Sequence, residues 1–94
     1  MKVLLTPQSQ IDISAIHAYI ARDKEHSADL MVARIQASFA RIAQFPEAGR
    51  PTRLLNIREV IVAPYVVPYR VKKKQQVVDI LRILHGKQDR SLSG

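Results

Sequence analysis

The residues best suited to chemistry lie in the second half of the chain, around one histidine. His85 is the only histidine in residues 50–94, and an imidazole carries a proton near neutral pH. Arg58 and Arg82 could hold the charge of a phosphate group, and Glu59 could act as a base. Together these groups would suit cleavage of a phosphodiester. Two structural interpretations remain open: an ion pair between Arg58 and Glu59, and a strand-terminal His85 that bonds to the backbone.

Positive charge is concentrated in the same half of the chain. Residues 50–94 carry ten Lys or Arg against three Asp or Glu, whereas residues 1–49 carry five of each. The formal charge of +7 therefore belongs entirely to the second half. Such a surface attracts polyanions or acidic proteins. Because solubility alone tolerates this much charge, the charge does not choose between these partners.

Length and composition predict one folded domain over residues 1–94. Hydrophobic residues make up 47% of the chain and charged residues 24%, which is ordinary globular usage. The sequence contains no cysteine, which excludes disulfides, thiolate metal sites and cysteine nucleophiles. We expect neither a metal nor a cofactor. The apolar runs are shorter than the roughly 20 residues that span a bilayer, so we expect a cytoplasmic protein with no membrane partner.

The first half of the chain is predicted to form a strand and two helices. Residues 2–5 are a short apolar run, and Thr6 before Pro7 is typical of a helix start, with Thr6 as the N-cap. Hydrophobic spacing predicts helices over about 7–22 and from a cap at Ser27 until Pro46. Two such helices joined by a short loop make an antiparallel hairpin. Its apolar stripes are expected to serve the core first and a partner groove second: Ile13, Ile16, Ile20, Ile35 and Phe39.

The second half is predicted to form an antiparallel meander of three strands that the helices cover on one face. Strands are expected over about 57–62 and 65–71, which are rich in β-branched residues, and over 77–84, the most apolar run of the chain. This order of elements predicts a two-layer α+β sandwich. Pro68 interrupts the second strand. Because proline cannot donate to a sheet ladder, it predicts a bulge or an edge-facing position there.

Several short segments follow one another in an order typical of one superfamily. They are Thr6-Pro7, Ile16 to Ala21, Phe45-Pro46-Glu47-Ala48-Gly49-Arg50-Pro51, Ile57-Arg58-Glu59-Val60, Val67-Pro68-Tyr69-Arg70-Val71 and Ile80-Leu81-Arg82-Ile83-Leu84-His85-Gly86. Over nearly its full length the chain resembles the ParE/RelE toxins of bacterial toxin–antitoxin systems. The resemblance implies the same strand, helix, helix, sheet order. It also implies a cognate antitoxin, usually an acidic, partly disordered protein that folds as it wraps the toxin.

The resemblance implies one of two activities. RelE-like members are endoribonucleases that cut messenger RNA on the ribosome, whereas ParE-like members bind and poison DNA gyrase without catalysis. Nuclease members tend to carry an aromatic residue after the last strand to stack a base, and none follows His85 in this chain. We therefore favour a ParE-like inhibitor of gyrase. A ribosome-dependent nuclease acting on mRNA and a small basic nucleic-acid-binding module are the alternatives.

The target surface that this interpretation predicts is the basic sheet face with the final strand and tail: Arg58, Tyr69, Arg70, Arg82, His85, Lys87 and Arg90. No catalytic residue is favoured, but a nuclease would use His85, Arg82 and Arg58. The antitoxin is expected to cover part of the same surface or the hairpin groove. Whether the arginines share one face with Tyr65 and Tyr69 depends on strand register, which a single sequence leaves open.

Overall fold

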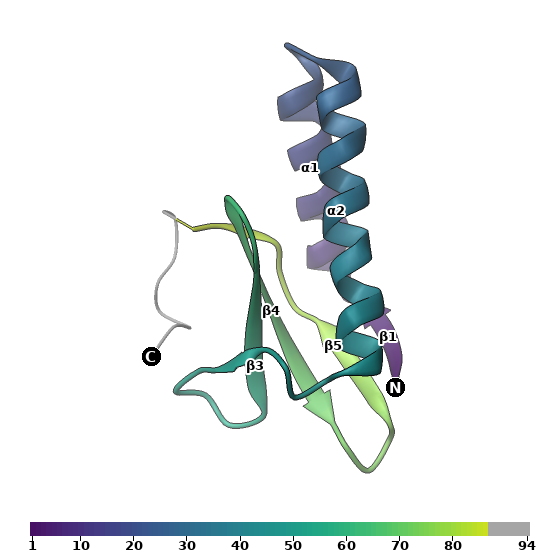
Figure 1. Ribbon diagram of the computed structural model, residues 1–94, viewed down its shortest axis with the longest axis vertical. Helices are drawn as coiled ribbons and strands as arrows, with labels where there is room; N and C mark the ends of the chain where they lie inside the picture. Colours follow the sequence, from purple (N-terminus) through teal and green to yellow (C-terminus); the bar gives the residue numbers. More distant parts are fainter. Residues whose placement is uncertain (87–94) are drawn as a thin grey trace.

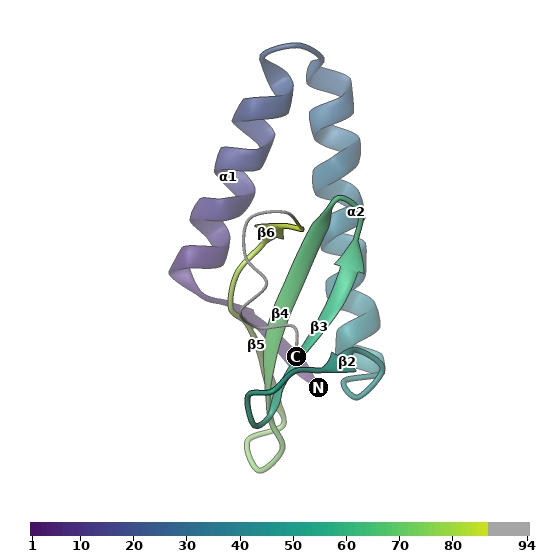
Figure 2. The ribbon, with the colours of Figure 1, turned by 90° about the vertical axis from the view of Figure 1, so that its left-hand side faces the viewer.

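The computed structural model describes residues 1–86 as two helices against one sheet. The elements are β1 (Lys2–Leu5), α1 (Pro7–Ala21), α2 (Glu25–Gln44), β2 (Arg50–Pro51), β3 (Ile57–Val62), β4 (Tyr65–Lys72), β5 (Val77–Ile80) and β6 (Leu84–His85). Figures 1 and 2 show the α1–α2 hairpin lying along one face of the sheet and projecting beyond it. The predicted α+β architecture is confirmed.

The sheet is mixed rather than antiparallel throughout. Its strand order is β1-β5-β4-β3-β2, with β6 pairing on β4. The meander β3, β4, β5 is antiparallel as predicted, but β1 pairs parallel to β5, with Lys2 opposite Val77 and Leu5 opposite Ile80. Parallel neighbours need a long connection between them, and here the helical hairpin and the first two meander strands supply it. The predicted antiparallel meander is therefore confirmed, and β1 extends it through a parallel pairing with β5.

The two helices begin in different ways. The Thr6 hydroxyl accepts a hydrogen bond from the Ser9 amide at 3.2 Å, which confirms Thr6 as the N-cap of α1. The predicted cap of α2 at Ser27 was wrong, because α2 starts two residues earlier at Glu25. Lys24 holds the cap position without a side-chain bond. A carboxylate in the first turn, that of Glu25, suits the positive end of the helix dipole.

The core lies between α2 and the face of the sheet that the helices cover. Alternate residues of β3, β4 and β5 point into it, and α1 contributes half-buried side chains at its margin. Eleven buried residues form this cluster: Ile35, Phe39, Ile42, Val62, Tyr65, Val67, Tyr69, Val71, Val78, Ile80 and Ile83.

Pro68 causes the bulge that its position predicted. Tyr69 of β4 lies opposite Ile80, and Val66 lies opposite Leu84. Between these two pairs β4 has two residues, whereas the facing chain has three, residues 81–83. The Pro68 carbonyl accepts a hydrogen bond from the Leu81 amide at 3.0 Å, but the proline nitrogen carries no hydrogen that it could donate to the Leu81 carbonyl. The Thr6 hydroxyl lies within hydrogen-bond distance of two carbonyl oxygens here, 2.8 Å from that of Ile80 and 3.0 Å from that of Leu81. Strand β5 therefore ends at Ile80, and residues 81–83 turn toward α1.

Candidate functional site

Tyr69 is a core residue and not part of a binding surface. Its side chain is fully buried, so its predicted contact with a target was wrong. The Tyr69 hydroxyl accepts the Gly49 amide at 3.0 Å and donates to the Pro46 carbonyl at 2.8 Å. Burial raises the pKa of Tyr69. A side chain at Gly49 would overlap this hydroxyl, so glycine is required where the chain leaves α2 for β2.

The arginines of the predicted surface do not share one face of the sheet. Arg58 lies opposite Tyr69 on the face that the helices cover, where its Nη1 donates to the Gly49 carbonyl at 2.8 Å. Arg70 is the next residue after Tyr69, so it points from the other face and is exposed. Its cross-strand neighbour there is Asp79, whose carboxylate pairs with Lys72 at 2.7 Å. The sequence left the strand register open, and the register found here places Arg58 and Arg70 on opposite faces of the sheet.

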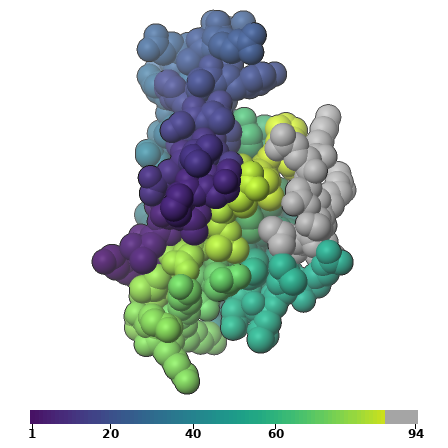
Figure 3. All heavy atoms as spheres, turned by 180° about the vertical axis from the view of Figure 1, so that it is seen from behind, coloured from purple at the N-terminus to yellow at the C-terminus, as the bar shows by residue number. Residues whose placement is uncertain are grey.

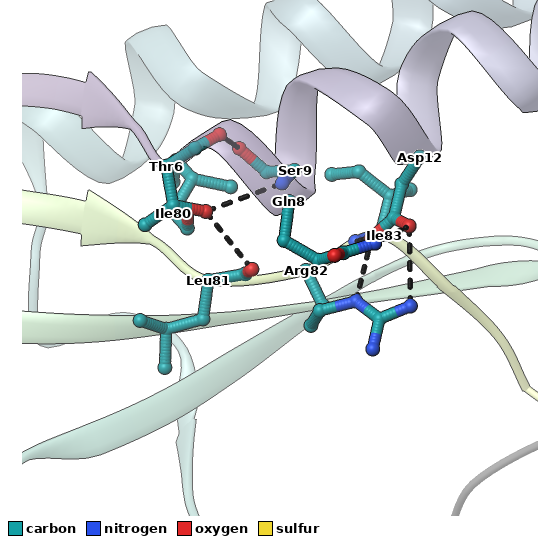
Figure 4. Close-up of polar contacts among 8 residues, drawn as sticks. All are labelled: Thr6, Gln8, Ser9, Asp12, Ile80, Leu81, Arg82 and Ile83. Carbon is teal, nitrogen blue, oxygen red and sulfur yellow. Dashed lines mark hydrogen bonds and ion pairs between the residues drawn. The ribbon is translucent and has the colours of Figure 1, made fainter.

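Arg82 is bound to α1 through Asp12 (Figure 4). Arg82 Nε and Nη2 donate to the two carboxylate oxygens of Asp12 at 2.8 and 3.1 Å. Asp12 also accepts the Ile83 amide at 2.9 Å and the Gln8 side chain at 3.2 Å. Burial raises the pKa of Asp12, but these hydrogen bonds outweigh burial and hold it below the usual value. The bulge at Pro68 is what turns Arg82 and Ile83 toward this carboxylate.

His85 and Glu59 each have a structural partner. The His85 ring meets the Tyr65 ring edge to face, with centroids 5.8 Å apart and planes at 81°. Glu59 is buried and accepts Arg50 Nε at 2.7 Å. The ion pair between Arg58 and Glu59, which the sequence left open, does not hold, because adjacent residues of a strand point to opposite faces.

A groove between α2 and the edge of β3 is a feature that the sequence analysis missed. Its volume is about 530 Å³, and the apolar residues that line it include Phe45 and Ile61, which are 56% and 57% exposed. Arginines line it as well: Arg34, Arg41 and Arg50. Within the described residues, Glu59 is the one acidic group of the lining, and Arg50 already pairs with it. The groove therefore favours an acidic ligand with apolar side chains.

The backbone at this edge of β3 is open to a further strand. The Thr52 amide donates to the Ile57 carbonyl at 3.2 Å, so the polar groups of Ile57 point away from β4. Direction alternates along a strand, so the groups of Glu59 and Ile61 point the same way. Arg50, the first residue of β2, lies opposite Glu59, so β2 does not reach as far along β3 as Ile61. In the described part of the chain no strand lies beside Ile61.

The hairpin residues predicted to contact an antitoxin differ in exposure. Ile13, Ile16 and Ile20 of α1 are half-buried, and Ile13 and Ile16 pack against the core. Ile35 and Phe39 of α2 are buried in the core, so they present no surface to a partner and that expectation was wrong. In residues 1–86 no group of three metal-ligating side chains occurs, and no helix there is long and apolar enough to cross a membrane.

Comparison with known proteins identifies the family. Residues 3–90 match the model of the family described as the ParE toxin of the type II toxin–antitoxin system, parDE. The chain belongs to the ParE toxin family. It is 37% identical to the inferred toxin Y4kP of Sinorhizobium fredii, over 81% of this chain and 78% of that protein. It is 32% identical to toxin RelE2 of Caulobacter vibrioides, over 90% and 94% of the two chains.

Solved structures share the fold of this ParE toxin. A chromosomal ParDE toxin–antitoxin system from P. aeruginosa contains a chain that matches with a TM-score of 0.78 at 27% identity, covering 90% of this chain and 95% of that one. The toxin–antitoxin complex RelBE2 from Mycobacterium tuberculosis matches with a TM-score of 0.68 at 19% identity, covering 89% and 95%. The second likeness shows the fold alone.

For the ParE toxin, the predicted target residues fall into three groups. Tyr69 is buried, and Arg58, Arg82 and His85 are each engaged by other parts of the chain. Arg70 is exposed on the uncovered face. Lys87 and Arg90, expected in the tail, lie outside the described residues.

Proposed function

We propose that this ParE toxin inhibits DNA gyrase by binding to it, breaks no bond itself, and is neutralised by an acidic antitoxin. Membership of the ParE toxin family supports the first part, because the resemblance to ParE-like toxins implies binding to gyrase. The likeness to a chain of a ParDE system supports the antitoxin.

The observation that carries the proposal is the separation of the groups that RNA cleavage would need. A base, an acid and a phosphate-binding cation must all reach one phosphodiester. Arg58 and His85 lie opposite Tyr69 and Tyr65, four residues apart on β4 and so about 13 Å along the strand. The Arg82 guanidinium group already donates two hydrogen bonds to the Asp12 carboxylate. This arrangement favours recognition by a surface over catalysis.

The groove between α2 and β3 is the best place for the antitoxin. An extended acidic segment there could pair with the open backbone of Ile61 as an added strand. Its apolar side chains would cover Phe45 and Ile61, and its carboxylates would meet Arg34 and Arg41. This site replaces the hairpin stripe as the proposed antitoxin surface, since two of the five stripe residues are buried.

Two assays on the purified chain test the function. The toxin should block supercoiling of relaxed plasmid by gyrase, and the antitoxin expressed from the neighbouring gene should restore it. Messages in a translating extract should stay intact at the same toxin concentration. Cleavage of those messages, with supercoiling unaffected, would instead assign the toxin to the ribosome-dependent nucleases.

A further inference from the structure

The loop between β2 and β3 presents two leucines to solvent. Leu55 is 87% exposed, the largest exposure among the large hydrophobic residues of the described chain, and Leu54 is 43% exposed. Neither belongs to the core cluster. The fold therefore gains little from Leu55, and covering it with a partner would remove apolar surface from water.

Hydrogen bonds hold this loop in one conformation. The Thr52 hydroxyl donates to the Ile57 carbonyl at 2.9 Å and accepts the Leu54 amide at 3.1 Å. The Ile57 amide donates back to the Leu54 carbonyl at 3.3 Å. Asn56 takes the left-handed conformation, with φ of 63°, and its carbonyl accepts the Val71 amide at 2.9 Å. A loop held in this way loses little conformational entropy on binding.

Positively charged residues lie near the leucines. Arg53 precedes them and is exposed, and the turn between β4 and β5 adds Lys73 and Lys74. Lys73 and the loop line the same hollow of about 390 Å³. Figures 1 and 3 show the loop and this turn at the same end of the molecule, remote from the tip of the helical hairpin. Glu47 also lines the hollow, and Lys73 pairs with it at 2.8 Å.

We propose that Leu54 and Leu55 form the apolar anchor with which the toxin binds its protein target, at an acidic surface containing an apolar pocket. This inference rests on the proposed function, in which the toxin acts by binding. A rigid, protruding tip fits a pocket that already exists in a folded protein, whereas the concave groove beside α2 fits a segment that folds as it binds. The two surfaces thereby serve different partners.

Leu55→Asp is the direct test, with Ile11→Asp as the matched control. Ile11 lies on α1 and is 60% exposed, so both variants place a carboxylate at an exposed apolar position. Both should melt within a few degrees of the wild type. We expect Leu55→Asp to relieve growth arrest in an expressing bacterium and to raise the toxin concentration for half-inhibition of gyrase at least tenfold. Ile11→Asp should change neither value more than twofold.

Growth arrest and inhibition of gyrase, measured side by side, separate this inference from the proposed function. Growth arrest by Leu55→Asp as strong as that by the wild type would overturn the anchor. Loss of arrest by both variants alike would overturn it too, since the loop would then have no special role. Relief by Leu55→Asp alone, while the wild type leaves gyrase unaffected, would support the anchor and reject gyrase as the target.

Discussion

Asp12 is predicted to hold the end of the sheet to α1, and its loss should be costly. In Asp12→Ala the buried Ile83 amide loses its acceptor, which costs about 1–3 kcal/mol. The paired hydrogen bonds from Arg82 are also lost, and because the Arg82 side chain is 44% exposed we count these as only about 1 kcal/mol. The total of about 3 kcal/mol corresponds to a fall of roughly 12–24 °C in melting temperature for a domain of this size.

Asp12→Asn separates charge from geometry. The amide oxygen can still accept the Ile83 amide, but the charge-assisted bonds from Arg82 are weakened, so we expect a loss of about 1 kcal/mol. Because the pKa of Asp12 is lowered in the folded chain, its carboxylate stabilises the fold above the ordinary pKa of about 3.9 and loses this effect as pH falls through the lowered value. The stability gap between the wild type and Asp12→Asn should therefore shrink on acidification.

Urea denaturation followed by circular dichroism, at pH 7 and again near pH 2, measures both effects. The asparagine variant of an exposed acid in the turn before α2, Asp23→Asn, controls for general loss of negative charge. A cost below about 1 kcal/mol for Asp12→Ala would refute the role given to the Ile83 amide. A gap for Asp12→Asn that stays constant with pH would refute the role given to the carboxylate charge.

Three further variants test other parts of the structure. Tyr69→Phe should cost about 2–3 kcal/mol in urea denaturation, because it leaves the Gly49 amide and the Pro46 carbonyl without their buried partner; a cost near zero would contradict this. Gly49→Ala should lower the melting temperature by more than Gly86→Ala, since a methyl group at Gly49 meets the Tyr69 hydroxyl whereas one at Gly86 stays 3.2 Å from its nearest neighbour. Arg41→Glu should raise the antitoxin concentration for half-neutralisation about tenfold, while Arg22→Glu, at the C-cap of α1, should leave it unchanged; equal effects would argue against the groove.

The order of elements could be predicted from the sequence because it depends on local signals. Thr6 and Pro7 mark the start of α1, and the density of β-branched residues marks β3 and β4. Pro68 predicted a bulge because the missing amide hydrogen has the same consequence in any central strand. The parallel pairing of β1 could not be predicted, since it depends on contacts between the two ends of the chain.

The site was harder to predict because it depends on strand register and on partners remote in sequence. Arg58 and Arg70 differ by an even number of positions, but they lie on two paired strands, and only the register of Arg58 opposite Tyr69 places them on opposite faces. Asp12 and Arg82 are 70 positions apart in the sequence, and no periodicity indicates such a pair. The groove likewise could not be predicted, because it forms only where α2 and β3 pack beside each other. Exposure of Leu55 is a property of the folded loop, although two adjacent leucines in a turn region were a visible signal.

A titration of gyrase with the wild type and His85→Ala tests most directly whether the toxin acts by binding. Inhibition of supercoiling should increase with the molar ratio of toxin to gyrase and reach a plateau, and His85→Ala should retain most of it. Messages in a translating extract that are cleaved by the wild type at far less than one toxin per ribosome, and spared by His85→Ala, would contradict the account.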